Sequence, residues 1–136
     1  MYVLDTNVVS EIRKSSPDSQ VLAWFREHRV LELYLSAITV FEIEMGVRRI
    51  ERRDEFQGRR LRRWLNEDVL GAFRGRILPL DQAVAVHAAS MQVPDPRPDR
   101  DCFIAAAAGV NGMTLVTRNA KDFRALGIPF INPWEA

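Results

Sequence analysis

Three acidic residues, far apart in the chain, occupy positions where a carboxylate could do chemistry. Asp5 directly follows residues 2–4, a short apolar run without alternation that is typical of a strand buried on both faces of a parallel sheet. Asp101 opens a helix predicted over residues 102–110, which is so apolar that it must be buried. Glu42 lies in a third segment. A strand that ends in a carboxylate places it at the C-terminal edge of the sheet, where open α/β sheets bind ligands.

Glu42 is the acid that we expect to be half-buried in a helix over residues 37–53. Glu44, two residues on, faces another direction and can pair with Arg48 one turn later. Gly46 lies one turn from Glu42 on the same face, where the lack of a side chain would let another backbone approach closely. The helix therefore offers one acid, Glu42, to a site.

Each acid also has a structural interpretation, which the sequence leaves open. Thr39 and Glu42 have the spacing of a capping box, in which two side chains bond the first backbone N–H groups of a helix. Asp5 or Thr6 could cap the helix that follows them, and Asp101 could cap its own helix. Taken singly, these explanations compete evenly with a role in catalysis.

Taken together, three carboxylates at one sheet edge indicate a metal site. Like charges in a partly buried site repel and shift each other's pKa, and a divalent cation such as Mg²⁺, which prefers oxygen ligands, removes that penalty. A cation held there can activate water and neutralise the charge that develops on a phosphodiester. The donors expected at the same edge, placed to hold phosphate oxygens, are Thr6, Asn7, Thr117, Arg118 and Asn119.

The sequence gives little indication of other kinds of catalytic site. His28 and His87 lie on different predicted elements without ligand spacing, so neither Zn²⁺ nor paired-histidine acid–base chemistry is expected. The chain has no glycine-rich phosphate loop and no Ser or Cys nucleophile with a partner. Cys102 is expected to be a small buried residue.

The elements that must position these residues alternate between strand and helix. Strands are predicted over residues 2–4, 31–36, 76–80, 113–117 and 128–131. Helices are predicted over residues 8–12, 16–29, 37–53, 56–75, 82–89, 102–110 and 118–123. This alternation predicts one α/β sandwich whose central, mostly parallel sheet of four to five strands is flanked by helices. The first strand is expected at the centre of the sheet, and the strand that contains Pro79 at an edge.

Length and composition are those of a single globular domain over residues 1–136. Apolar residues make up 47% of the chain and charged residues 27%, which excludes a disordered protein. No apolar run approaches the roughly 20 residues that a membrane span needs, and no secretory signal is visible. Cys102 is the one cysteine, so an intrachain disulfide cannot form, which suits a reducing compartment. We therefore expect a cytoplasmic protein.

The small net charge of +1 conceals an arginine-rich middle. Over residues 48–76 ten arginines accompany five acids, which leaves +5 there and −4 in the rest of the chain. Arginine suits bidentate phosphate contacts, so this region could be a nucleic-acid surface. Alternatively, it is a solvated helical face with internal ion pairs. The pairs then expected are those of Arg48 and Arg52 with Glu44, Glu51 and Glu55.

A set of motifs follows in order along essentially the whole chain. They are Leu4-Asp-Thr-Asn7, Ser36-x-x-Thr39-x-x-Glu42-x-x-x-Gly46, Asp101-x-x-Ile104-Ala-Ala-x-Ala108, Leu115-Val-Thr-Arg-Asn119 with Asp122-Phe123, and the closing Pro129-x-x-Asn-Pro133. Their combination resembles a PIN domain. More closely, it resembles the bacterial VapC-type toxins of toxin–antitoxin pairs, including the FitB-like branch.

This resemblance implies a three-layer PIN-like sandwich and an endoribonuclease that prefers single strands and depends on Mg²⁺ or Mn²⁺. By the resemblance, Asp5, Glu42 and Asp101 are the metal-binding catalytic acids. It also implies two kinds of partner besides the RNA substrate. The chain would form a homodimer, and it would be silenced by a small cognate antitoxin, in a heterotetramer or larger, whose C-terminal part obstructs the site.

The chain departs from the family pattern at Asn119, where many relatives carry a fourth acid. Asp122 lies three residues on, about one helical turn, and could substitute through a water as a further catalytic acid. The sequence leaves open whether one or two metal ions bind, and whether Asn119 or Asp122 completes the site.

Two rival functions remain open. One is a structure-specific DNA nuclease of related fold, which would use the same acids. The other is a non-catalytic module in which the acids serve only to bind a partner. A receiver-type phosphoacceptor is not expected, because Asp5 is followed by Thr6 and neither Lys14 nor Lys121 is placed at the required strand end.

Overall fold

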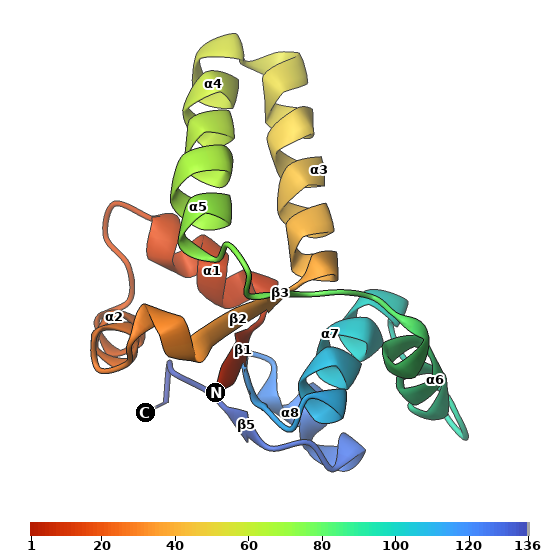
Figure 1. The fold of residues 1–136 in the computed structure, drawn as a ribbon. Coiled ribbons are helices and arrows are strands. Elements are labelled where there is room, and N and C mark those ends of the chain that lie inside the picture. The colour runs from red at the N-terminus through yellow and green to blue at the C-terminus, as the bar shows by residue number, and fades with distance from the viewer. Residues whose placement is uncertain (136) are drawn as a thin grey trace.

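The computed structural model describes residues 1–135, which form a five-stranded sheet with helices on both faces (Figure 1). The strands are β1 (Tyr2–Leu4), β2 (Leu33–Ser36), β3 (Ile77–Leu78), β4 (Thr114–Val116) and β5 (Phe130–Ile131). They lie in the order β3-β2-β1-β4-β5, and every neighbouring pair is parallel. The predicted fold class is confirmed, as are the central place of β1 and the edge place of β3.

Eight α-helices connect and cover these strands in the part of the chain that the structure describes. They are α1 (Thr6–Arg13), α2 (Ser19–Arg26), α3 (Ala37–Arg53), α4 (Glu55–Arg63), α5 (Leu70–Ala72), α6 (Gln82–Ser90), α7 (Asp99–Val110) and α8 (Ala120–Phe123). Two 3₁₀ turns, η1 (Val30–Glu32) and η3 (Arg124–Leu126), and one π-helical turn, η2 (Trp64–Val69), complete the set. Within residues 1–135, no helix is both long and apolar enough to cross a membrane.

Several predicted boundaries were wrong, each for a local reason. The second strand starts at Leu33, because the residues before it close the 3₁₀ turn η1. The third strand is only two residues long and ends before Pro79, which has no N–H to donate to a ladder. The single long helix predicted over residues 56–75 is divided by the π-turn η2 into α4 and α5.

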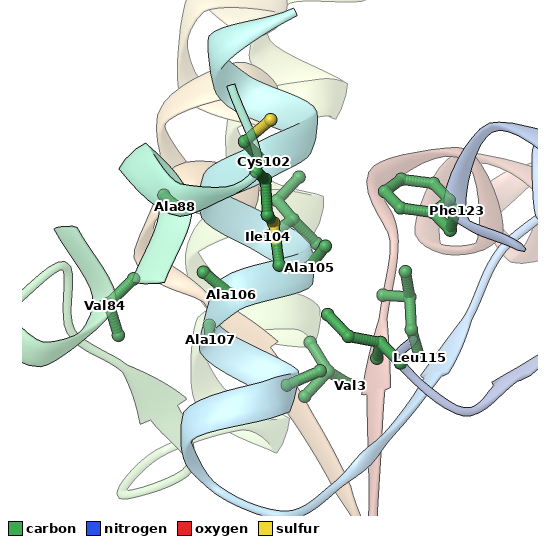
Figure 2. Close-up of a cluster of buried hydrophobic side chains, with 13 residues drawn as sticks. Val3, Val84, Ala88, Cys102, Ile104, Ala105, Ala106, Ala107, Leu115 and Phe123 are labelled. Carbon is green, nitrogen blue, oxygen red and sulfur yellow. The ribbon is translucent and has the colours of Figure 1, made fainter. Parts of the chain in front are cut away.

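The sheet separates two apolar layers, so the predicted three-layer arrangement is confirmed. Val3 and Leu4 are both buried but point to opposite faces, as expected of a central strand. Figure 2 shows the layer on the Val3 face, where the alanine-rich α7 packs between the sheet and α6. The layer on the Leu4 face contains Val8, Trp24, Ile43, Leu65 and Val69.

The helices α3 and α4 form an antiparallel hairpin that extends away from the sheet (Figure 1). Their closest approach is at Gly58, where an added Cβ would lie 2.6 Å from the Cα of Glu51. The close approach predicted at Gly46 was wrong. No atom of another element in residues 1–135 lies within 4 Å of a Cβ built there, because that face of α3 borders an open groove.

One arginine joins the two helices of the hairpin. Arg62 of α4 donates to Glu44, with Nη1 2.6 Å from Oε1, and to Glu51, with Nη2 3.0 Å from Oε1. The predicted pair of Arg48 with Glu44 is confirmed at 2.6 Å. The pairing predicted for Arg52 was wrong: no carboxylate in the described chain bonds it, because Arg62 takes Glu51 across the hairpin. These contacts hold the pKa of Glu44 at about 2, far below its usual range.

Candidate active site

The three predicted acids line one cleft at the carboxyl end of the sheet. The cleft has a volume of about 480 Å³ and contains Asp5 after β1, Glu42 from α3 and Asp101 from α7. It lies where parallel strands end and their connections diverge, which is the usual place for a ligand in this class of fold. Three acids separated by up to 96 positions in the chain are thus brought to one cleft.

Asp5 lies at the base of the cleft and is almost inaccessible, with 5% of its surface exposed. Its Oδ1 accepts a hydrogen bond from the backbone N–H of Thr6 at 2.8 Å, and its Oδ2 accepts one from the hydroxyl of Thr117 at 2.7 Å. Burial raises the pKa of Asp5 to about 6, against the effect of these bonds, and the charges of Asp101 and Glu42 raise it further. Asp5 therefore carries a charge that the protein alone compensates poorly.

Glu42 is half-buried, as predicted, and is held by a neighbouring hydroxyl. Thr6 donates from its Oγ1 to Glu42 Oε1 at 2.7 Å, and the hydroxyls of Thr6 and Thr39 lie 3.1 Å apart. On its outer side, Glu42 Oε2 lies 3.5 Å from Nη1 of Arg100. The capping-box interpretation of Thr39 and Glu42 was wrong, because the hydroxyl that caps α3 is that of Ser36.

Asp101 projects from the first turn of α7 into the same cleft. This helix begins at Asp99 and its cap position is Pro98, so the interpretation of Asp101 as an N-cap was wrong. Burial raises the pKa of Asp101, and so do the charges of Glu42 and Asp122. Among residues 1–135, no donor bonds its carboxylate, which leaves both oxygens available to a ligand.

The helix-cap interpretation is confirmed for Asp5, whose side chain caps α1 through the N–H of Thr6. This role does not compete with a place in the cleft, because Asp5 lines the cleft while its second carboxylate oxygen accepts from Thr117. A capping carboxylate held at both oxygens has a fixed orientation. That rigidity is what a ligand-binding group needs.

Four of the five polar residues predicted at this edge line the cleft, namely Thr6, Asn7, Arg118 and Asn119. The fifth, Thr117, is fully buried and acts behind the cleft: it donates to Asp5 and accepts the N–H of Asn119 at 3.0 Å. Asn7 and Arg118 are also joined, since Oδ1 of Asn7 accepts the backbone N–H of Arg118 at 3.3 Å. The loop after β4 is thereby tied to α1.

Asp122 does not line the cleft. It lines an adjacent cavity of about 310 Å³ that Asp101 also borders, and its charge raises the pKa of Asp101. Asn119, in contrast, lines the cleft itself. Of the two candidates for a fourth position, Asn119 is thus nearer to the other acids along the cleft wall.

Several residues of the cleft and its rim were not predicted as part of the site, among them Arg100 and Trp134. Arg100 bonds Glu42 and lies over the ring of Phe41, with its Cζ 5.7 Å from the ring centroid. Arg118 lies 5.0 Å over Trp134, which lines the cleft from the end of the chain. The signal for Arg100 was its position next to Asp101. Nothing in the sequence indicated Trp134, which reaches the cleft only because β5 lies beside β4.

The donor set fits a hard divalent cation. In residues 1–135 no three His, Cys, Asp or Glu side chains are grouped closely enough to hold one ion in their present conformations. However, Asp5, Glu42 and Asp101 supply only oxygens and face one cleft. The charge of Glu42 raises the pKa of both aspartates, and the charge of Asp101 raises the pKa of Asp5. A cation would relieve that repulsion, and oxygen is the ligand that Mg²⁺ and Mn²⁺ prefer.

Comparison with known proteins gives a consistent result. The family model described as PIN domain matches residues 2–129. The chain is 40% identical over 143 residues to VapC ribonuclease Y4jK of Sinorhizobium fredii, covering 99% of each. It is 34% identical over 142 residues to toxin FitB of Neisseria gonorrhoeae, covering 98% of this chain and 99% of FitB. The crystal structure of FitAcB from that organism superposes with a TM-score of 0.92 at 34% identity, over 100% of both chains.

Proposed function

This chain belongs to the PIN domain family, and from that premise we propose that it is a metal-dependent endoribonuclease, the toxin of a toxin–antitoxin pair. It would hydrolyse phosphodiester bonds in RNA. The observation that carries the proposal is the meeting of Asp5, Glu42 and Asp101 in one cleft. Its support from relatives is that two similar proteins over nearly their full length are named a VapC ribonuclease and a toxin.

In this proposal Asp5, Glu42 and Asp101 hold Mg²⁺ or Mn²⁺, and Asn119 or Asp122 completes the site. The bound cation supplies an activated water and neutralises charge that develops on the phosphodiester. Asp5 is the most rigid of the three acids, because Thr6 and Thr117 fix its two oxygens. The raised pKa of Asp5 makes its oxygens more basic than those of an exposed aspartate, and a basic oxygen binds a cation more strongly.

The remaining polar residues of the cleft position the substrate. Arg118 and Asn119 lie on the wall formed after β4, where they can donate to phosphate oxygens. Asn7 holds the backbone of Arg118 in place from the opposite side. Thr6 orients Glu42, so a single residue links the β1 end of the cleft to α3.

We further propose that the chain works in the cytoplasm with a small cognate antitoxin and as a homodimer. Relatives support the first partner: a structure of 34% identity is described as FitAB bound to a DNA fragment, and a structure of 22% identity from Klebsiella pneumoniae is described as a toxin–antitoxin complex. An antitoxin that covers the cleft would silence the acids without altering the fold. Co-expression with a candidate antitoxin tests this, since rescue of growth is the expected outcome.

The test of the activity is the variant Asp101→Asn, with Asp99→Asn as the matched control. Both acids lie in the first turn of α7, but Asp99 is outside the cleft and bonds Gln92. We expect Asp101→Asn to abolish RNA cleavage and growth inhibition with its melting temperature preserved, and Asp99→Asn to retain both activities. Cleavage at the wild-type rate by folded Asp101→Asn would refute the assigned role.

Two further measurements separate the rival functions. Cleavage of flap DNA in preference to single-stranded RNA would favour the DNA nuclease. Isothermal titration that detects no Mg²⁺ or Mn²⁺ binding at millimolar metal, together with no cleavage of either substrate, would favour a non-catalytic module.

A further inference from the structure

A second groove leaves the acidic cleft and follows the hairpin of α3 and α4. It has a volume of about 370 Å³ and lies between α1, α3 and the start of η2. Thr6 and Glu42 line both the groove and the cleft, so the two spaces join at these residues. Whatever occupies the cleft can therefore continue into the groove.

One stripe of α3 forms a wall of this groove. Glu42, Gly46, Arg49 and Arg53 recur at intervals of four, three and four residues, which places them on one face of a helix. At about 1.5 Å per residue, the stripe extends about 16 Å from the acid to the last arginine. Arg13 of α1 contributes a third arginine from the other side.

These three arginines differ from those on the opposite face of the hairpin. In the described chain Arg49 and Arg53 have no carboxylate partner, and Arg13 contacts only the ring of Trp64, with its Cζ 5.7 Å from the centroid. Arg48 and Arg62, by contrast, are engaged by acids of α3. The positive charge that faces the groove is therefore left for an external anion.

The base of the groove is apolar and open. Between the arginines it is formed by Ile43, Val47, Ile50, Leu61 and Trp64. Gly46 adds no side chain, and a Cβ built there meets nothing within 4 Å. A row of cations beside an apolar surface with an aromatic ring is the combination that binds a single nucleic-acid strand, because phosphates contact the cations and the sugars and bases contact the ring.

We propose that this groove binds the single-stranded RNA on one side of the bond to be cut, with Arg13, Arg49 and Arg53 contacting its phosphates. The proposal rests on the proposed function and extends it to a substrate-binding surface. A stretch of about 16 Å accommodates several stacked nucleotides at about 3.4 Å each. The strand would enter the acidic cleft past Thr6 and Glu42.

RNA is favoured over a protein segment for two reasons visible in the structure. First, the groove is continuous with the cleft, and a phosphate chain held in the cleft must leave it along some path. Second, the charged residues that line the groove besides Glu42 are three arginines without a carboxylate partner in the described chain, Arg49 and Arg53 on one face of α3 and Arg13 on α1. An apolar peptide could pack against the apolar base of the groove, but it would leave the charges of the three arginines unpaired.

The test measures binding separately from cleavage. A fluorescently labelled 12-nucleotide single-stranded RNA of mixed sequence is titrated with protein in EDTA, and its anisotropy is recorded from 50 to 300 mM KCl. The variant carries Arg49→Glu and Arg53→Glu. The control carries Arg52→Glu and Arg63→Glu, which make the same charge change at exposed positions outside the groove. Losing two phosphate contacts should weaken RNA binding about tenfold or more at 50 mM KCl. The slope of log K against log salt concentration should become shallower by about 1.4. The control should change binding less than threefold.

A second variant tests the shape of the groove and leaves charge unchanged. Gly46→Leu adds a side chain whose Cβ meets nothing within 4 Å, and it replaces a glycine in the interior of a helix. We expect an unchanged or higher melting temperature together with RNA binding weakened at least fivefold. Because the fold is not perturbed, a loss of binding reports obstruction.

The outcomes are distinguishable from those of the proposed function. Wild-type cleavage with equal RNA binding by the groove and control variants would overturn the inference and leave the ribonuclease standing. Arginine-dependent RNA binding without cleavage in Mg²⁺ or Mn²⁺ would leave the groove standing and overturn the ribonuclease. If the groove variants bind RNA normally but fail to bind the co-expressed antitoxin, the groove belongs to a protein partner and the inference is wrong.

Discussion

Replacing Asp5 with asparagine should stabilise the metal-free protein at neutral pH while removing its activity. The pKa of Asp5 rises from its ordinary value of 3.8 to about 6, mainly because the residue is buried. At about 1.36 kcal/mol per pKa unit, burying this charge costs about 3 kcal/mol once the carboxyl is ionised. Asparagine has no charge at any pH. It keeps the acceptor for the N–H of Thr6 but presents an amide to Thr117, which costs about 1 kcal/mol. The net expectation is a gain of about 2 kcal/mol.

Because the pKa of Asp5 is raised in the folded protein, the free energy of unfolding should fall as the pH increases. The folded protein binds a proton at Asp5 more tightly than the unfolded chain does. The stability that comes from the protonated carboxyl is therefore fully present below about pH 4 and is lost as the pH rises through about 6. The advantage of Asp5→Asn should therefore be full at pH 8 and absent at pH 4.5. Urea denaturation in EDTA at both pH values measures it. Asp18→Asn is the control, because Asp18 also caps a helix but lies outside the cleft.

Saturating Mg²⁺ should reverse the order of the two proteins. A ligand at about 100 times its Kd stabilises the folded state by about 2.7 kcal/mol, and the wild type alone should receive this at the acidic cleft. If Asp5→Asn is less stable than the wild type at pH 8 in EDTA, or if its advantage is the same at pH 4.5, then the charge of Asp5 is not held at a cost and the electrostatic account of the cleft is wrong.

Three other changes have expected outcomes. Thr117→Val removes the bond to Asp5 from a fully buried position and should lower the free energy of unfolding by about 1–2 kcal/mol in urea, with weaker Mg²⁺ binding. Gly58→Ala should destabilise by about 1–3 kcal/mol, because its Cβ meets the backbone of Glu51, whereas Gly46→Ala should stabilise by about 0.5–1 kcal/mol. Mg²⁺ affinity should rise as the pH increases from 5 to 7, since Asp5 must lose its proton; titration calorimetry that finds equal affinity at both would contradict this.

Much of the fold was predictable because its signals are local. The apolar residues 2–4 indicate a central strand whichever helices cover it, and the alanine-rich helix indicates burial by composition alone. The convergence of Asp5 and Asp101 follows from topology. The helix α7 ends beside the start of β4, so it begins at the opposite edge of the sheet, where β1 ends. Glu42 was harder to place, since its orientation depends on the hydroxyl of Thr6, 36 residues away.

The errors arose where a contact across the fold decides between local alternatives. Thr39 and Glu42 have the spacing of a capping box, yet the helix is capped three residues earlier by Ser36, whose hydroxyl accepts the N–H of Ile38. Gly46 and Gly58 are equally good candidates for a close approach, and only the path of the hairpin determines that Gly58 is the one. Spacing along one helix cannot reveal what lies opposite it.

The arginine-rich middle illustrates why a charge count is insufficient. Glu44 and Glu42 are two residues apart, so they lie about 200° apart around α3 and face opposite ways. On the Glu44 side, Arg48 and Arg62 form the internal ion pairs of the solvated-face interpretation. On the Glu42 side, the arginines face the groove without such partners in the described chain. The two interpretations of the sequence thus concern two faces of one helix, and a charge reversal on each face should have different effects: lower stability on the first, weaker RNA binding on the second.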